Sequence, residues 1–450
     1  MKCHIITFGC QMNVHDSDWL GRALAQRGFS LAPPEEADVV IVNTCSVREK
    51  PELKVYSQLG RLGAIRDQHN PGMFVAVGGC VAQQIGLGFW ERFPFVRLVF
   101  GTDGVAMAPQ AIERLMREPG LRLSLLDFTE EYVERDPALH GDTRGPAQVF
   151  VNIMQGCDNF CAYCIVPYVR GRQKSRSAPS VLDECRRHVA RGAREITLLG
   201  QNVNSFGLDS HGDGTSFAHL LRQVAAIDGL ERLRFTTSHP KDLADEVIGL
   251  FGELDNLCPQ LHLPLQSGSD AVLAAMGRKY DTARYFGLVD KLRAARPDIE
   301  LSTDLIVGFP GETDADFRAT LDAMERVRYA TSFSFRYSDR PGVRAERMSP
   351  KVPQDEAAAR LMTLQELQNS FTNETLAAML GKHAVVLFEG ASRKQDDTDM
   401  DAWRGRDPYN HVVNVACPAA CGDMTGKCAA VRIADAKKHS LIGTLEGTPW

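Results

Sequence analysis

The sequence of 450 residues is 44% hydrophobic and 24% charged, and its formal net charge at pH 7 is −6. This composition is typical of a water-soluble globular protein with about two to four domains. The chain has no apolar run of about 18 residues and no signal-peptide pattern, so we expect a cytoplasmic protein without membrane spans. In that compartment the twelve cysteines predict metal or redox chemistry rather than disulfides.

Residues 1–125 alternate apolar runs with helix-like stretches, a pattern that predicts a parallel sheet covered by helices. Three of the four apolar runs end at a cysteine. These runs cover residues 4–9, 38–44 and 73–79, and the cysteines that follow them are Cys10, Cys45 and Cys80. Ligands of open α/β sheets collect at the carboxyl ends of the strands. We therefore expect the three thiols to converge on a cluster that keeps one open position.

The alternative is that these cysteines are ordinary core residues, which is a common fate of a free cysteine. Their equivalent positions at three strand ends favour the metal site. Gly9, Gly78 and Gly79 support it, because glycine lets the backbone come close to an inorganic cluster.

Residues 126–145 have the composition of an acidic linker. Between Asp127 and Asp142 there are six acidic residues and a single arginine, Arg135. The rest of the chain is close to neutral. RNA binding would therefore have to depend on local surfaces rather than on bulk charge.

Residues 146–377 contain six strand-like runs that alternate with amphipathic helices. The runs cover residues 148–154, 195–199, 232–236, 260–265, 301–307 and 331–337. Six βα units are too few for a closed eightfold barrel, so they predict a partial (βα)6 barrel with its catalytic loops at the carboxyl face.

The loop after the first of these runs holds Cys157, Cys161 and Cys164 in the spacing C-x3-C-x2-C. A closed zinc site or a ferredoxin-type cluster normally has four protein ligands. Three thiolates on a four-iron cube leave one iron open. The spacing resembles the signature of radical S-adenosylmethionine (SAM) enzymes, in which the open iron binds SAM. A chance group of cysteines or an incomplete zinc knuckle is the alternative, and the flanking residues disfavour it.

Polar side chains follow several other predicted strands of this segment. Amides, hydroxyls and a carboxylate of this kind could orient SAM, although each could equally serve a turn or a helix cap. The candidates for SAM binding are Gln201, Asn202, Gln266, Ser267 and Asp304.

A basic run at residues 167–176 follows the cysteine motif. It could meet a polyanionic substrate at the site. The alternative is a solvated charged face, and the sequence favours neither.

Residues 378–446 change to short strands separated by polar loops, which predicts a small OB-like β-barrel. The expected strands cover residues 383–388, 411–415, 427–433 and 441–445. Cys417, Cys421 and Cys428 lie in this segment, and their spacing matches no cluster or zinc pattern, so we expect incidental thiols.

With these motifs in place, nearly the whole chain resembles the methylthiotransferase family of radical SAM enzymes. The resemblance is carried by Phe8-Gly9-Cys10-Gln11-Met12-Asn13, Asn43-Thr44-Cys45-Ser46-Val47-Arg48, Gly78-Gly79-Cys80, Gly156-Cys157 through Cys164, and Phe388-Glu389-Gly390 in a TRAM-like barrel. Two departures stand out. The family commonly has R-P-G-T where this chain has Arg340-Pro341-Gly342-Val343, and Asp407 replaces a usual threonine.

The resemblance implies two [4Fe-4S] clusters and SAM as cofactors. It implies that Cys157, Cys161 and Cys164 hold the cluster that cleaves SAM, while Cys10, Cys45 and Cys80 hold a second cluster that carries or supplies sulfur. Asp158-Asn159-Phe160 and Thr236-Thr237-Ser238-His239-Pro240 are most similar to members that methylthiolate C2 of dimethylallylated adenosine next to the tRNA anticodon. The implied partners are a tRNA anticodon loop and an electron donor of the flavodoxin or ferredoxin kind, and we expect a monomer.

Other functions remain open at this point. Within the family, the substrate could be a ribosomal-protein aspartate or a threonylcarbamoyl-modified adenosine. A noncatalytic iron–sulfur protein that binds RNA or carries electrons is an alternative of another class.

Overall fold

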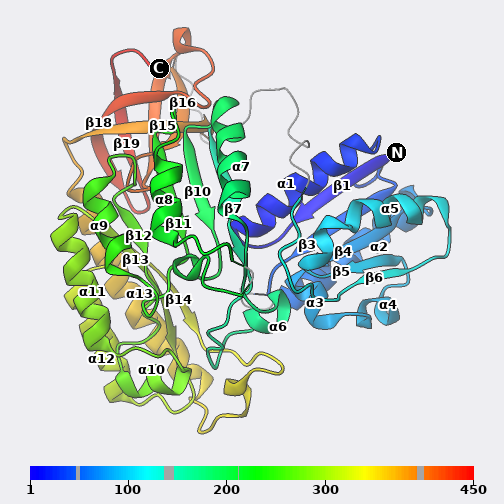
Figure 1. Ribbon diagram of the computed structural model, residues 1–450, viewed down its shortest axis with the longest axis horizontal. Coiled ribbons are helices and arrows are strands. Elements are labelled where there is room, and N and C mark those ends of the chain that lie inside the picture. The colour runs from blue at the N-terminus through cyan, green and yellow to red at the C-terminus, as the bar shows by residue number, and fades with distance from the viewer. Residues whose placement is uncertain (47–50, 136–145, 211, 393–399) are drawn as a thin grey trace.

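The computed structural model describes residues 1–46, 51–135, 146–210, 212–392 and 400–450. Figure 1 shows an N-terminal α/β unit in blue and cyan, a central α/β unit in green and yellow, and a C-terminal barrel in orange and red. The predicted fold class is confirmed. Within the described residues, no helix is both long and apolar enough to cross a membrane.

The N-terminal unit is a six-stranded parallel sheet in the order β2-β1-β3-β4-β5-β6. Its strands are β1 (Lys2–Thr7), β2 (Ser30–Leu31), β3 (Val39–Thr44), β4 (Phe74–Gly79), β5 (Val96–Phe100) and β6 (Leu123–Leu125). Its helices are α1 (Gln11–Gln26), α2 (Pro51–His69), α3 (Cys80–Ile85), α4 (Gly88–Arg92) and α5 (Ala108–Arg117). The sequence missed β2 and β6 because both are short edge strands.

Alternate residues of the central strands pack on opposite faces of this sheet. Val39 and Ile41 of β3 lie in one hydrophobic core with α1 and α5. Val40 and Val42 lie in the other, with α2, α3 and α4. The chain reverses its direction across the sheet between β1 and β3, where open α/β sheets bind their ligands.

The central unit contains the six predicted parallel strands. They are β7 (Gln148–Asn152), β10 (Glu195–Leu199), β11 (Arg232–Thr236), β12 (Gln260–His262), β13 (Glu300–Val307) and β14 (Thr331–Arg336). They form two three-stranded sheets, β11-β10-β7 and β12-β13-β14, and a bridge between Leu233 and Leu257 continues the first toward the second. The remaining strands of this unit are β8 (Met154–Gln155) and β9 (Lys174–Ser175).

Helices cover the outside of the central strands, and their apolar faces form the largest hydrophobic core of the chain. They are α7 (Ala178–Ala190), α8 (Phe217–Ala225), α9 (Asp245–Glu253), α10 (Asp270–Met276), α11 (Thr282–Ala295), α12 (Asp314–Val327) and α13 (Gln354–Ala377). The short helix α6 (Val166–Arg170) follows the cysteine motif and lies against the N-terminal unit (Figure 1).

The C-terminal unit is a closed barrel in the order β15-β16-β17-β19-β18. Its strands are β15 (His383–Ala391), β16 (Met400–Arg406), β17 (Val412–Pro418), β18 (Cys428–Lys437) and β19 (Ser440–Glu446). The sequence predicted four of these strands and missed β16, whose stretch is polar and lacks a clear alternation of apolar residues.

The barrel docks on the amino ends of the core strands. Arg232, the first residue of β11, donates to the carbonyl oxygens of Arg406 and Val385 at 2.9 and 2.7 Å. His411 of the barrel lies 2.9 Å from the carboxylate of Glu300, the first residue of β13. The cysteine motif follows the carboxyl end of β7, so the barrel lies at the opposite end of the core (Figure 1).

Asp407, where the family usually has threonine, is part of this docking contact. Its buried carboxylate accepts from the backbone N–H of His411 at 2.8 Å and lies 2.9 Å from the ring Nδ1. Burial by itself lowers the pKa of His411, but the hydrogen bonds to Asp407 and Glu300 outweigh it and raise the pKa to about 10.

This pKa predicts how the stability of the docked barrel depends on pH. The pKa of His411 is higher in the folded chain than its ordinary value of 6.5. The stabilisation is therefore complete below about pH 6.5 and is lost as the pH rises toward 10. We expect the urea concentration at the unfolding midpoint of the wild type to fall as the pH rises from about 6.5 to 10. His411→Gln lacks the titrating group, so its midpoint should have a smaller slope against pH. An equal slope in both proteins would contradict the assignment.

Candidate metal centre

Cys10, Cys45 and Cys80 meet at the carboxyl edge of the N-terminal sheet. Cys10 is the N-cap of α1, Cys45 follows β3, and Cys80 begins α3 directly after β4. The thiols of Cys10 and Cys80 each hydrogen-bond with that of Cys45. The convergence expected from the strand ends is therefore present in the structure.

Two glycines permit this approach. A Cβ atom on Gly9 would lie 2.4 Å from the Cβ of Cys45, and one on Gly79 would lie 2.3 Å from the carbonyl oxygen of Thr44. Both residues also have positive φ, at +134° and +90°, which side chains disfavour. The cysteines could not come together in this way with larger residues at either position.

Arg170 of α6 places a buried positive charge beside these thiols. Its hydrogen bond to Cys80 and its attraction to Cys10 and Cys45 link the central unit to the N-terminal triad. The hydrogen bonds to Cys45, and then the charge of Arg170, lower the pKa of Cys10 and Cys80, whereas the pKa of Cys45 is raised. Thiolate is the form of cysteine that binds metal.

Val343, the second departure from the family pattern, lies in the same contact. It is buried in a small apolar cluster with Cys80, Ile165 and Val169. The cluster packs apolar side chains of the central unit against Cys80 of the N-terminal triad.

Cys157, Cys161 and Cys164 lie in the loop after β8. Gly156 has a φ of +79°, and a Cβ on it would lie 2.0 Å from the carbonyl oxygen of Arg172, so the loop passes tightly under the residues after α6. Burial raises the pKa of Cys157, and burial together with repulsion from Cys161 and Cys157 raises that of Cys164 to about 12. The three thiols are therefore close enough to act on one another.

Arg278 supplies positive charge to this second triad. Its guanidinium donates to the sulfur of Cys161 at 3.5 Å and to the hydroxyl of Tyr163 at 3.3 Å. Tyr280 accepts from the same guanidinium at 2.9 Å and fixes its direction. Nothing in the sequence pointed to Arg278, which is more than a hundred residues from the motif.

The donor sets fit four-iron clusters by their chemistry. Each triad offers three thiols, the ligand type of iron–sulfur clusters, and leaves one iron of a four-iron cube without a protein ligand. Each triad also has a buried arginine beside it, whose charge offsets that of thiolates. Among the described residues, no three His, Cys, Asp or Glu side chains surround a single ion position.

The five candidates for SAM binding have different surroundings. Gln201 accepts from the backbone N–H of Gly156 at 2.6 Å, so it lies at the loop of the second triad. Asn202 donates to Asp242 at 2.7 Å. Gln266 has a φ of +76° and pairs through its backbone with Asp304 and Ile306.

Ser267 and Asp304 are held by neighbouring side chains. The Ser267 hydroxyl lies 3.3 Å from that of Thr320 and accepts from the N–H of Ser269. The partly exposed carboxylate of Asp304 lies 3.4 Å from the ring of His262. Of the five candidates, Gln201 is the one with a direct contact to the cysteine loop, and SAM binding by all five stays a prediction.

The basic run at residues 167–176 is a solvated charged face only at Arg172, and its contact with a polyanionic substrate stays a prediction. Arg170, Lys174 and Arg176 are only 4%, 2% and 6% exposed. Lys174 pairs with Asp103 of the N-terminal unit at 2.5 Å, and Arg176 pairs with Glu184 at 2.6 Å. These three residues are part of the interface between the two α/β units, because carboxylates and thiols match their charges there.

The cysteines of the barrel have packing roles. Cys417 and Cys428 are buried, and the thiol of Cys428 donates to Glu231 of the central unit at 3.2 Å. Burial raises the pKa of Cys417 to about 11 and that of Cys428 to about 12. These neutral thiols agree with the expectation of incidental cysteines.

Two family models match parts of this chain. Residues 151–324 match the radical SAM superfamily, and residues 2–101 match a family described as uncharacterized protein family UPF0004. The matched ranges contain the second and the first cysteine triad, respectively.

Two relatives that align over nearly their whole length share one name. The chain is 64% identical over 447 residues to a tRNA-2-methylthio-N(6)-dimethylallyladenosine synthase of Nitratidesulfovibrio vulgaris strain Hildenborough, covering 99% of both proteins. It is 46% identical to the protein of that name from Geobacter sulfurreducens, covering 98% of this chain and 97% of the relative.

Solved structures share the fold at low identity. The radical SAM methyltransferase TsrM of Kitasatospora setae has a TM-score of 0.57 and 16% identity, covering 77% of this chain and 74% of that chain. The cobalamin-dependent SAM radical enzyme OxsB has a TM-score of 0.53 and 12% identity, covering 82% of this chain and 56% of that chain.

The position of Arg170 leads to a prediction about thiol chemistry. In cluster-free protein, Arg170→Gln removes the charge that favours the thiolate of Cys10. We expect alkylation of Cys10 by iodoacetamide at pH 7 to slow several-fold, as followed by peptide mass spectrometry. Arg172→Gln is the matched control, because this exposed arginine pairs with Asp158 instead. Equal rates in the wild type and the Arg170 variant would show that the charge does not act on this thiol.

Proposed function

The chain belongs to the tRNA-2-methylthio-N(6)-dimethylallyladenosine synthase family of radical SAM enzymes, and we propose that its two cysteine triads are the two metal sites of that reaction. It is a methylthiotransferase, and its cofactors are SAM and two [4Fe-4S] clusters. The observation that supports the site assignment best is the contact of Arg170 with the thiols of the other unit, because it brings both triads to one interface.

The two triads divide the work between them. Cys157, Cys161 and Cys164 hold the cluster that, when bound, supplies the electron for SAM cleavage. Cys10, Cys45 and Cys80 would hold the second cluster, which carries or supplies the sulfur for C2 of the adenine ring. The cofactors carry the hard chemistry, and the protein holds them and the substrate in register.

Buried charges set the electrostatics of each site. Arg278 and Arg170 each place a guanidinium beside one triad, where it offsets the negative charge of thiolate ligands. Gln201 orients the loop of the second triad through its bond to Gly156. We propose that Gln201, Asn202, Gln266, Ser267 and Asp304 surround SAM at the carboxyl face of the core.

The proposed substrate is the dimethylallylated adenosine next to the anticodon of a tRNA, as in the name of the relatives. The shared name favours this substrate over a ribosomal-protein aspartate or a threonylcarbamoyl-modified adenosine. It also favours an enzyme over a noncatalytic iron–sulfur protein. OB-like barrels often bind oligonucleotides, but the position of this barrel does not suit the anticodon loop. The barrel contacts the amino ends of strands such as the eight-residue β13, about 23 Å from the carboxyl face. It would therefore hold a part of the tRNA outside the loop.

An exposed aromatic side chain next to the second triad could receive a base of the loop. Phe160 is 45% exposed and has a φ of +49°, a conformation that side chains disfavour. The guanidinium of Arg172 lies 5.3 Å from its ring centroid. Aromatic rings with neighbouring arginines stack well on unpaired RNA bases. We propose that this pair stacks on a base beside the reacting adenosine.

The remaining proposals concern domains, partners and location. We propose domains at residues 1–125, 146–377 and 378–446, with an acidic linker at 126–145. Residues 136–145 lie outside the described part of the chain, and Arg135 already contacts Asp16 of α1 at 2.7 Å. We also propose a monomer in the cytoplasm that receives electrons from a protein of the flavodoxin or ferredoxin kind.

Separate cysteine variants test the division of work. After anaerobic reconstitution, Cys161→Ala should abolish reductant-dependent formation of 5′-deoxyadenosine. Cys80→Ala should keep SAM cleavage and lose the 2-methylthio product, measured by nucleoside mass spectrometry of the tRNA. Iron near eight atoms per chain is expected for the wild type and about four for each variant. Full SAM cleavage by Cys161→Ala would show that the sites are wrongly assigned.

The stacking proposal predicts that a variant weakens tRNA binding and leaves SAM cleavage unchanged. Phe160→Leu should raise the KM for tRNA at least several-fold while SAM cleavage without tRNA stays at the wild-type rate. Leu31→Ala, which changes an exposed apolar side chain of edge strand β2, is the control. An unchanged KM in the Phe160 variant would remove this contact from the substrate site.

A further inference from the structure

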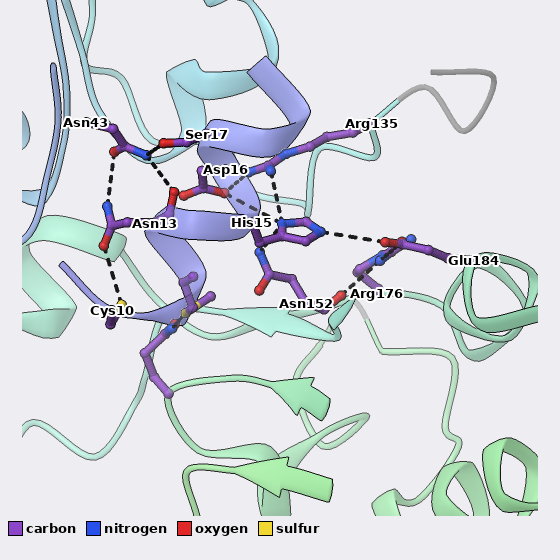
Figure 2. Close-up of polar contacts among 12 residues, drawn as sticks. Cys10, Asn13, His15, Asp16, Ser17, Asn43, Arg135, Asn152, Arg176 and Glu184 are labelled. Atoms are coloured by element: carbon purple, nitrogen blue, oxygen red, sulfur yellow. Dashed lines mark hydrogen bonds and ion pairs between the residues drawn. The ribbon is translucent and has the colours of Figure 1, made fainter. Parts of the chain in front are cut away.

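A polar network joins α1 of the N-terminal unit to the core (Figure 2). His15 lies at its centre. Its ring Nδ1 is 3.0 Å from the amide nitrogen of Asn152 on β7, and its Nε2 is 3.6 Å from the carboxylate of Glu184 on α7. The side chains of His15 and Glu184 are each 11% exposed, so the contact is nearly free of solvent.

Four charged groups hold these partners in place. Arg176 donates to Glu184 at 2.6 Å and to the carbonyl oxygen of Asn152 at 2.9 Å. Arg135 pairs with Asp16, the neighbour of His15, at 2.7 Å. Glu134 pairs with Arg176 at 2.9 Å, so residues 134–135 contact both the core side and the α1 side of the network. Each ion pair restricts the direction in which its neighbours can point.

The other side of α1 is fixed to its own sheet. Asn13 exchanges hydrogen bonds with Asn43 of β3. The side-chain amide of Asn13 donates to Asn43 Oδ1 at 3.0 Å, and Asn43 donates to the backbone carbonyl oxygen of Asn13 at 3.0 Å. Ser17 accepts from Asn43 and from Thr7 of β1. These bonds fix α1 to the sheet edge that carries the first triad. A displacement of that edge would therefore displace His15 relative to the core.

The two triads lie at equal sequence distances from this contact. His15 is five residues after Cys10, the N-cap of α1, which corresponds to about 7.5 Å along the helix axis. Asn152 is five residues before Cys157, along the strand and loop that lead to the second triad. A shift at His15 would be passed to both cysteine sites over short, rigid paths.

We propose that His15 and Glu184 are positioning residues that set the separation of the two cysteine triads and thereby couple SAM cleavage at one to methylthio transfer at the other. The proposal rests on the proposed function. A displacement of about 1 Å in such a site can slow a reaction about a hundredfold. SAM cleavage needs the second triad alone, whereas product formation needs both, so loss of the contact separates the two rates.

The test compares variants that differ in whether they can keep the contact. His15→Leu removes the contacts with Asn152 and Glu184, together with a 3.4 Å contact of the ring with Arg135. His15→Gln retains an acceptor for Asn152 and a donor for Glu184. His188→Leu is the matched control. His188 lies 3.7 Å from the carboxylate of Glu184, but both residues are on α7, so this contact does not join the two units. The readouts are 5′-deoxyadenosine formed per methylthio product, and hydrogen exchange of α1 and β7 in the reconstituted enzyme.

We expect His15→Leu to cleave SAM at the wild-type rate, to form at least tenfold less product, and to exchange the amides of α1 faster. His15→Gln should recover most of the coupling, and His188→Leu should match the wild type. A wild-type ratio in His15→Leu, or an equal rise in His188→Leu, would overturn the proposal. If His15→Leu does not fold, the ratio in Glu184→Gln decides in the same way. A wild type that forms no methylthio product would instead refute the proposed function.

Discussion

A buried guanidinium beside three thiols is the interaction that joins the two proposed metal sites. Arg170 is 4% exposed, and a charge at that depth is stable only with a partner of opposite sign. Its partners are the cysteines of the N-terminal sheet, yet Arg170 itself lies six residues after Cys164 of the other triad. The segment formed by the cysteine loop and α6 therefore carries the three proposed ligands of one site and the counter-charge of the other. The N-terminal triad has this counter-charge only when the two units are docked.

The same interface explains how an acidic chain can contain a basic run. Lys174 is matched by Asp103, and Arg176 is matched by Glu184 and by Glu134 of the acidic segment. These charges are directed inward, so they contribute to docking and little to the outer field that would attract RNA. Substrate affinity must then come from contacts of other kinds, such as the exposed ring of Phe160.

The barrel adds a second constraint on the substrate. Its contacts through Arg232, His411 and Asp407 fix it to the amino ends of the core strands, away from the cysteine loops. An RNA bound by both the barrel and the catalytic face has to extend along the core. A tRNA is long enough to do so, which agrees with an enzyme that modifies a base within a folded RNA rather than a free nucleoside.

The sequence by itself determined the local features of this protein. The C-x3-C-x2-C spacing, the six core strands and the three strand-end cysteines follow from short-range periodicity and from the rule that parallel strands end at one edge. The tertiary structure alone decided which charges meet. Arg170 with Cys80, Arg278 with Cys161 and His15 with Glu184 each join positions about ninety or more residues apart. Such pairs, like the missed strand β16, depend on the packing of whole units, and no local pattern encodes that packing.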